Sequence, residues 1–80
     1  MLSSVRLTHD AEANAAYLFL VDHIDRGEVA FTRMADIPLE GAWLSVDFDT
    51  AGRILGIEIL GANRILRDET IARAEDITRR

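Results

Sequence analysis

The chain has no cysteine and no lysine, and only one of its 80 residues is proline. Without cysteine it can form neither disulfides nor thiolate–zinc sites, and it has no thiol nucleophile. Without lysine it lacks the residue that Schiff-base chemistry and Walker-type phosphate loops require. Because a chain without cysteine fits a reducing compartment, we expect a cytoplasmic protein.

Long hydrophobic runs are also missing. The longest apolar run covers residues 15–21, whereas a membrane-spanning helix needs roughly 18–20 apolar residues. Residues 1–10 contain no apolar stretch behind a basic flank, the pattern that marks a secretory signal. The sequence therefore predicts neither a membrane segment nor export.

Positive charge is scarce. Nine arginines stand against 14 acidic residues, which gives a net charge of −5, and most of the excess acid lies in the first half of the chain. Binding to a phosphate backbone needs clustered cations, so nucleic acid is an unfavourable partner. A basic protein is a favourable one, because complementary charge speeds association.

The length predicts one domain, residues 1–80, with a small hydrophobic core. Turn signals recur at meander spacing and separate stretches typical of strands. The expected strands cover residues 5–8, 15–21, 28–33, 42–48 and 53–60. We therefore predict an α+β fold: an antiparallel β-meander of about four to five strands over residues 5–60, followed by a C-terminal turn and helix over residues 61–80.

The last two strands form the clearest hairpin. A four-residue loop over 49–52, with Gly52 at a positive φ, puts four apolar side chains on one face. These are Leu44, Val46, Leu55 and Ile57. This register sets Trp43 opposite Glu58 and Gly56 opposite Ser45. Gly56 would leave a shallow place in the sheet, where the C-terminal helix or another chain could pack.

Two segments are candidates for contact with another chain. Residues 15–21 are apolar on both faces, which predicts a central strand or one covered by a partner. Residues 69–78, with Asp68 as N-cap, predict a helix with a narrow apolar stripe that packs on its own sheet or on another chain. The candidate interface residues are Tyr17, Phe19, Val21, Ile71, Ala74 and Ile77.

Two polar clusters could in principle hold a metal ion or supply a general base. They are His9 with Asp10 and Glu12, and His23 with Asp22 and Asp25. Neither has the ligand spacing of known metal sites, and both fall in expected turns, where Asp side chains bond to the backbone. We predict turns at both positions, with no metal and no cofactor.

Asp47 and Glu58 form a third polar group, on the sheet face that carries Trp43. Paired carboxylates are the catalytic groups of glycosidases, but such enzymes need a cleft that a chain this short has little room to build. The other interpretation is a solvent-facing polar face, or a rim where a partner's arginines dock. We favour the second, and we predict no catalytic residues.

Two stretches carry a family resemblance. Residues 10–18 read DAEANAAYL, and residues 46–62 read VDFDTAGRILGIEILGA. The chain resembles the YuzE-like family of small bacterial proteins, a domain of unknown function, over residues 5–66. It departs from the family pattern at His9, Ala11 and Asn14, where the family commonly has an aromatic residue, proline and aspartate.

The resemblance implies a small β-rich domain and transfers no catalytic residue. Some members are similar to small proteins encoded beside toxins, which implies an antitoxin-like role. Our leading hypothesis is a protein–protein interaction module, either a homo-oligomer or an acidic partner of a basic protein. The alternative is a small hydrolase or metal-dependent enzyme that uses Asp47 and Glu58, and a third is a ligand-binding domain.

Overall fold

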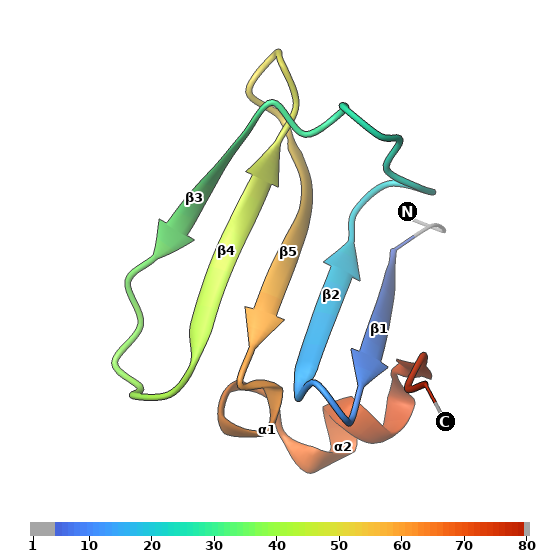
Figure 1. The fold of residues 1–80 in the computed structure, drawn as a ribbon, viewed down its shortest axis with the longest axis vertical. Coiled ribbons are helices and arrows are strands. Elements are labelled where there is room, and N and C mark those ends of the chain that lie inside the picture. Colours follow the sequence, from blue (N-terminus) through green and yellow to red (C-terminus); the bar gives the residue numbers. More distant parts are fainter. Residues whose placement is uncertain (1–4, 80) are drawn as a thin grey trace.

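The computed structural model describes residues 5–79, which form a mixed six-stranded sheet with two short helices (Figure 1). The strands are β1 (Arg6–Asp10), β2 (Ala15–Phe19), β3 (Phe31–Ala35), β4 (Trp43–Phe48), β5 (Ile54–Leu60) and β6 (Glu75–Asp76), and the helices are α1 (Ala62–Ile65) and α2 (Asp68–Arg73). The predicted α+β class is therefore confirmed, with most of the regular structure in strands.

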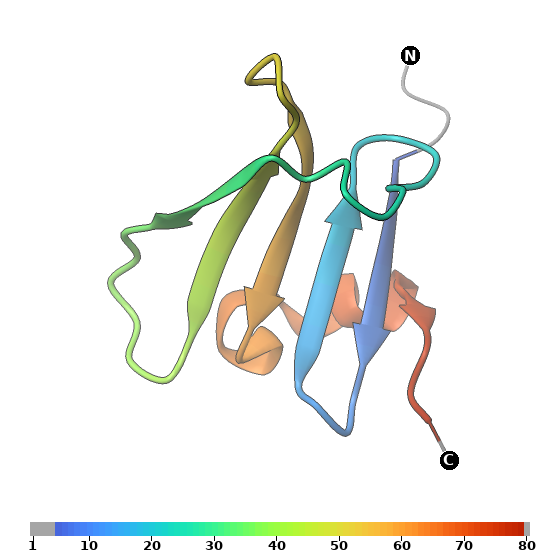
Figure 2. The ribbon, with the colours of Figure 1, turned by 45° about the horizontal axis from the view of Figure 1, so that its top comes forward.

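The strand order, β3-β4-β5-β2-β1-β6, is not that of a simple meander. Strands β3 to β5 do form a meander, and β1 and β2 form a hairpin, but β2 pairs with β5 rather than with β3. Residues 20–30 cross the end of the sheet and bring β3 to the far edge (Figures 1 and 2). The apolar β2 thus takes an interior place, paired on both sides, as the central-strand interpretation predicts.

The β4–β5 register differs from the predicted one by two residues. Val46 lies opposite Ile57 instead of Leu55, because Phe48 pairs with Ile54 and a bulge follows between Asp47 and Phe48. Gly52 has the predicted positive φ, 79°. A shift of two preserves the faces, so Leu44, Val46 and Ile57 share a face as predicted, while Leu55 lies unpaired at the bulge and is buried.

The same shift makes the predicted cross-strand partners wrong. Trp43 lies opposite Leu60 rather than Glu58, and Gly56 lies opposite Asp47 rather than Ser45. The place that Gly56 leaves open is filled neither by the C-terminal helix nor by another chain. It is filled by the ring of Tyr17 from the same sheet.

Several predicted element boundaries are also wrong. The second strand ends at Phe19 rather than at residue 21, and the third covers residues 31–35 rather than 28–33. The predicted helix over 69–78 ends at Arg73, and Asp68 is its first residue rather than its N-cap. Residues 75–76 instead form β6, which pairs in parallel with β1. Ile77 N–H also donates to the His9 carbonyl at 2.9 Å. Backbone hydrogen bonds to the unpaired edge of β1 therefore determine the structure of residues 75–77, rather than continuation of the helix and its narrow apolar stripe.

The core lies between the sheet and the C-terminal helices. Ala16 and Ile59 from the sheet meet the fully buried Ala62 of α1. Around them pack Leu7, Leu44, Ile57, Ile65 and Leu66. The C-terminal segment therefore packs on its own sheet, and both helices lie behind it in Figure 2.

Asn14 ties the β1–β2 turn to the start of α1. It has a positive φ of 53°, a conformation that asparagine adopts more readily than most residues. Its side chain accepts a bond from Asn63 N–H at 3.0 Å and donates to Asn63 Oδ1 at 2.8 Å. Its carbonyl accepts the Gly61 and Ala62 N–H groups, both at 2.9 Å. This clamp fixes the helices at one end of the sheet.

Candidate functional site

The face of the sheet opposite the helices, which we call the open face, carries the side chains that alternate with the core residues. These are Arg6, Thr8, Tyr17, Phe19, Thr32, Met34, Trp43, Ser45, Asp47, Gly56, Glu58 and Leu60. Both helices of the described residues pack on the other face. The open face therefore holds Tyr17, Phe19, Trp43, Asp47 and Glu58, which were singled out in the sequence.

A chain of hydrogen bonds crosses the open face. The Tyr17 hydroxyl on β2 donates to Asp47 Oδ2 on β4 at 2.6 Å. The Thr32 hydroxyl on β3 donates to Asp47 Oδ1, also at 2.6 Å. Bonds this short to a carboxylate are among the stronger ones in proteins. Each Asp47 oxygen thus accepts a bond within the chain, so this carboxylate serves as a structural acceptor.

Gly56 allows the Tyr17 side chain to extend across β5 to Asp47. Strand β5 lies between β2 and β4, so the tyrosine ring must pass over it to meet Asp47. A Cβ atom added at Gly56 would overlap the ring and lie 2.7 Å from the Tyr17 hydroxyl and 2.8 Å from the Leu18 carbonyl oxygen. Only glycine leaves this path free. The residues of the two family-like stretches thus meet here, Tyr17 from the first and Asp47 with Gly56 from the second.

The environment of Tyr17 favours its neutral form. Burial, the hydrogen bond to Asp47, and the negative charges of Asp47 and Glu58 together raise the pKa of Tyr17 well above its usual range. An unperturbed tyrosine has a pKa near 10. Tyr17 therefore stays a hydrogen-bond donor throughout the neutral range.

Titration of the tyrosine tests this arrangement directly, since the chain has only one tyrosine. We expect the absorption of tyrosinate to appear in the folded protein only well above pH 10, and at lower pH in an Asp47→Asn variant. Because the folded-state pKa is raised, the linked stability is fully present below the unfolded pKa and is lost as pH rises through the folded pKa. A tyrosine that titrates in the same range in both proteins would contradict the hydrogen bond.

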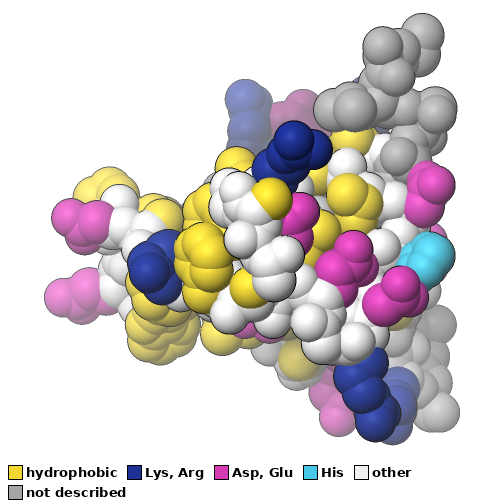
Figure 3. All heavy atoms as spheres, turned by 90° about the horizontal axis from the view of Figure 1, so that it is seen from above, with side chains coloured by type: hydrophobic (Ala, Val, Ile, Leu, Met, Phe, Trp, Pro, Cys, Tyr) yellow, Lys and Arg dark blue, Asp and Glu magenta, His cyan; other side chains and the backbone are white. Residues whose placement is uncertain are grey.

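An exposed apolar cluster lies at the end of the open face nearest the β3–β4 loop. Its members are Met34, Trp43 and Leu60, which are 62%, 52% and 39% exposed. Trp43 and Leu60 are direct cross-strand partners, and Met34 lies opposite the neighbouring Ser45. Viewed from above, hydrophobic side chains gather on the β3 side of the molecule (Figure 3). Glu58, an exposed acid, lies opposite Ser45 and therefore beside this cluster.

The other half of the open face is already occupied by contacts within the chain. The Arg6 guanidinium lies 4.0 Å from the centre of the Phe19 ring, a cation–π contact. Phe19 in turn packs against Tyr17, with ring centres 4.7 Å apart. Both aromatic residues are half-buried. On the open face, the large apolar side chains that remain exposed are thus those of Met34, Trp43 and Leu60.

The structure does not bring the candidate interface residues to one surface. Tyr17 and Phe19 lie on the open face, and Val21 follows β2 in the connection to β3. Ile71 lies in α2, on the side of the sheet where the helices pack, and Ala74 ends that helix. Ile77, which is 49% exposed, follows β6.

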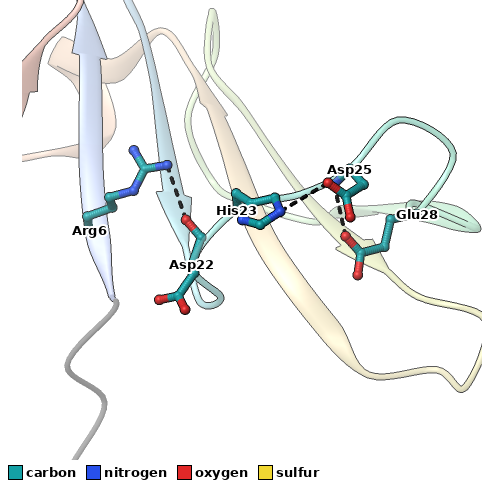
Figure 4. Close-up of polar contacts among 5 residues, drawn as sticks. All are labelled: Arg6, Asp22, His23, Asp25 and Glu28. Atoms are coloured by element: carbon teal, nitrogen blue, oxygen red, sulfur yellow. Dashed lines mark hydrogen bonds and ion pairs between the residues drawn. The ribbon is translucent and has the colours of Figure 1, made fainter.

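Asp10 and Asp25 shape turns, as predicted for their clusters, whereas His9 lies within β1. Asp10 Oδ1 accepts the N–H groups of Glu12 and Ala13 at 3.0 and 3.1 Å. In the second cluster His23 Nε2 lies 3.0 Å from Asp25 Oδ1, and Asp25 N–H donates to Glu28 Oε1 at 2.9 Å (Figure 4).

Arg6 joins the connection between β2 and β3 to the sheet, since its Nη2 donates to the Asp22 carbonyl at 3.4 Å (Figure 4).

A separate hollow of about 270 Å³ lies between β1 and α2, lined by Leu7, Glu69, Thr70 and Arg73. It is on the helix side, away from Trp43. No helix in the described part of the chain has the length and apolar character needed to span a membrane.

Comparison of the chain with models of known protein families, with curated proteins and with solved structures found no match. The resemblance to the YuzE-like family therefore remains a prediction from the two sequence stretches.

Proposed function

We propose that this protein is a cytoplasmic protein–protein interaction module that binds a basic partner through the Trp43 end of its open face. One observation carries the proposal: Met34, Trp43 and Leu60 form an exposed apolar cluster on a sheet face that no described helix covers. Exposed apolar groups gathered in one place are a feature of interaction sites, whereas single scattered ones are not.

The chemistry of this cluster suits a protein partner. Tryptophan is enriched among the residues that contribute most to binding, and methionine adapts its shape to the surface that it meets. Burying apolar surface stabilises a complex by roughly 25 cal/mol per Å² before the costs of association are subtracted. Met34, Trp43 and Leu60 are therefore the expected source of affinity.

Charge selects the partner. Glu58 is exposed beside the cluster, and the whole chain has a net charge of −5. Asp47 is half-buried and its oxygens accept bonds from Tyr17 and Thr32, so Glu58 is the acid available at the rim. An arginine or lysine of a partner would pair with Glu58, and the net charge would speed the encounter.

The family resemblance supports a narrower form of this proposal, in which the chain neutralises a toxin-like basic protein. The alternative, a hydrolase that uses Asp47 and Glu58, has less support. Asp47 lies opposite Gly56 rather than Glu58, and each of its oxygens already accepts a hydrogen bond. The hollow between β1 and α2 is on the other side of the sheet.

The emission of Trp43, the only tryptophan, gives a direct test. The probes are two synthetic peptides of equal length, one alternating leucine with arginine and the other leucine with glutamate. We expect the arginine peptide to shift the Trp43 emission to shorter wavelength in a saturable way, with an affinity that falls as salt is added. We expect no shift with the glutamate peptide.

Two matched variants locate the contact. Leu60→Ser removes an apolar side chain next to Trp43 and should weaken binding of the arginine peptide by about tenfold. Ile54→Ser removes one that is also exposed, 46%, but lies at the far end of β5, and should leave the affinity unchanged. Equal responses to both peptides, or equal effects of both variants, would overturn the proposal.

A further inference from the structure

Strand β3 forms the outer edge of the sheet and has no strand paired on its outer side among residues 5–79. An edge strand presents unpaired N–H and C=O groups, and proteins usually protect it by making it very short, by proline, by charged side chains (lysine above all), or by a covering segment. The opposite edge, β6, has only two residues. In contrast β3 has five, Phe31–Ala35, without proline or lysine, and four of them are exposed.

The side chains of Phe31, Thr32 and Arg33 contact one another along the edge and residues of β4. Arg33 Nη1 donates to the carbonyl of its neighbour Thr32 at 3.2 Å. Its guanidinium carbon lies 5.0 Å from the centre of the Phe31 ring. That ring stacks on Phe48 of β4, with centres 5.0 Å apart. The Thr32 carbonyl thus takes a bond from a side chain, in the place where a neighbouring strand would supply an N–H group.

We propose that β3 pairs in antiparallel fashion with β3 of a second copy, so that the protein is a symmetric dimer with one continuous sheet. A two-fold axis perpendicular to the sheet keeps each face on its own side, which allows only registers that pair residues of the same face. An axis through Arg33 would set two like charges directly opposite each other, which destabilises a sheet. An axis through Thr32 avoids this conflict.

The Thr32 register makes the edge complementary to itself. Thr32 lies opposite Thr32 of the partner subunit, and the two exchange backbone hydrogen bonds in place of the bond from Arg33. Arg33 then lies opposite Phe31 of the partner subunit, and Phe31 opposite the partner's Arg33. The cation–π contact that each chain makes within itself is thereby matched by one across the interface. A second copy is therefore the occupant that fits these side chains.

This inference is independent of the proposed basic partner, because it concerns the edge of the sheet rather than its open face. The two are compatible, since the dimer would carry both Trp43 clusters on the same face of the joined sheet. Failure of the peptide titration would leave the dimer standing, and a monomeric protein would leave the peptide-binding proposal standing.

Mass in solution, measured by light scattering across a concentration series, gives the first test. We expect about twice the chain mass of 8.9 kDa, with dissociation on dilution. Arg33→Glu should raise the dissociation constant by about tenfold or more, because symmetry removes the Arg33–Phe31 contact twice. Arg53→Glu makes the same charge change in the exposed β4–β5 turn and should leave the dissociation constant unchanged.

Cysteine cross-linking tests the register. Because the sequence has no native cysteine, any disulfide must form at the introduced residue. In the Thr32 register the two Thr32 Cα atoms lie roughly 5.5 Å apart, within the range that a disulfide spans. Thr32→Cys should therefore form a disulfide-linked dimer under mild oxidation, whereas Thr50→Cys in the exposed turn should not. A monomeric wild-type protein, or equal cross-linking at both positions, overturns the proposal; should Thr32→Cys not fold, the Arg33→Glu and Arg53→Glu masses decide.

Discussion

Gly56→Ala is expected to destabilise the fold by about 3 kcal/mol, near the upper end of the cost of overpacking. The added methyl group would overlap the Tyr17 ring and lie 2.8 Å from the Leu18 carbonyl oxygen. The ring would have to move, which would stretch or break its bond to Asp47. A chain of 80 residues has a small stability margin, so this one methyl group should remove much of it.

The measurement is unfolding in urea. A lower midpoint concentration in the variant, with the same dependence of the unfolding free energy on urea concentration as in wild type, reports the loss of stability. A double-mutant cycle shows where the overlap lies. In a Tyr17→Ala background the ring is absent, so the cost of Gly56→Ala should fall by about 1 kcal/mol or more. If the cost is small in wild type, or the same in both backgrounds, Tyr17 does not pass over Gly56 as described.

Asp47→Ala should destabilise the fold by about 2–3 kcal/mol, because it leaves two hydroxyl groups, one of them half-buried, without their acceptor. Tyr17→Phe and Thr32→Val each remove one bond and should cost about 1 kcal/mol, with Thr32→Val the smaller because Thr32 is exposed. Unfolding in urea again provides the measurement.

Glu58→Ala is the matched control for this series. Glu58 is an acid on the same face, but it is not part of the hydrogen bonds that join Tyr17, Asp47 and Thr32. We expect its effect to stay within about 0.5 kcal/mol, as for most exposed positions. Equal effects of Asp47→Ala and Glu58→Ala would mean that the two acids have equivalent roles and would reject the structural role of Asp47.

Local sequence patterns predicted much of the fold. The alternation in residues 42–48 and 53–60 located β4 and β5 and their shared apolar face, and the Asp and Gly signals located the turns. The bulge at Asp47 and Phe48 could not be predicted, because one extra residue changes no alternation pattern outside the bulge itself. The loop is also one residue longer than predicted, since Phe48 pairs with Ile54 rather than Arg53. Together the longer loop and the bulge made the predicted partners of Trp43 and Gly56 wrong.

Contacts between residues far apart in the sequence could not be predicted either. Nothing local in residues 75–76 indicates a strand, and β6 forms because the edge of β1 offers bonding groups. Asn14 signalled a turn, but its bonds to Asn63, 49 residues away, depend on the fold being complete. Likewise, the sequence singled out Tyr17, Asp47 and Gly56 separately. Only the strand order, with β5 between β2 and β4, makes one site of them.

The most direct test of the open face as a binding surface for a basic partner is selection from a library of random peptides on the immobilised protein. We expect enriched peptides to carry a net positive charge next to large apolar residues, to lose binding to a Trp43→Ser variant, and to keep binding to Ile54→Ser. Enrichment of neutral or acidic peptides, or of peptides that bind the Trp43→Ser variant equally well, would contradict the proposed binding surface.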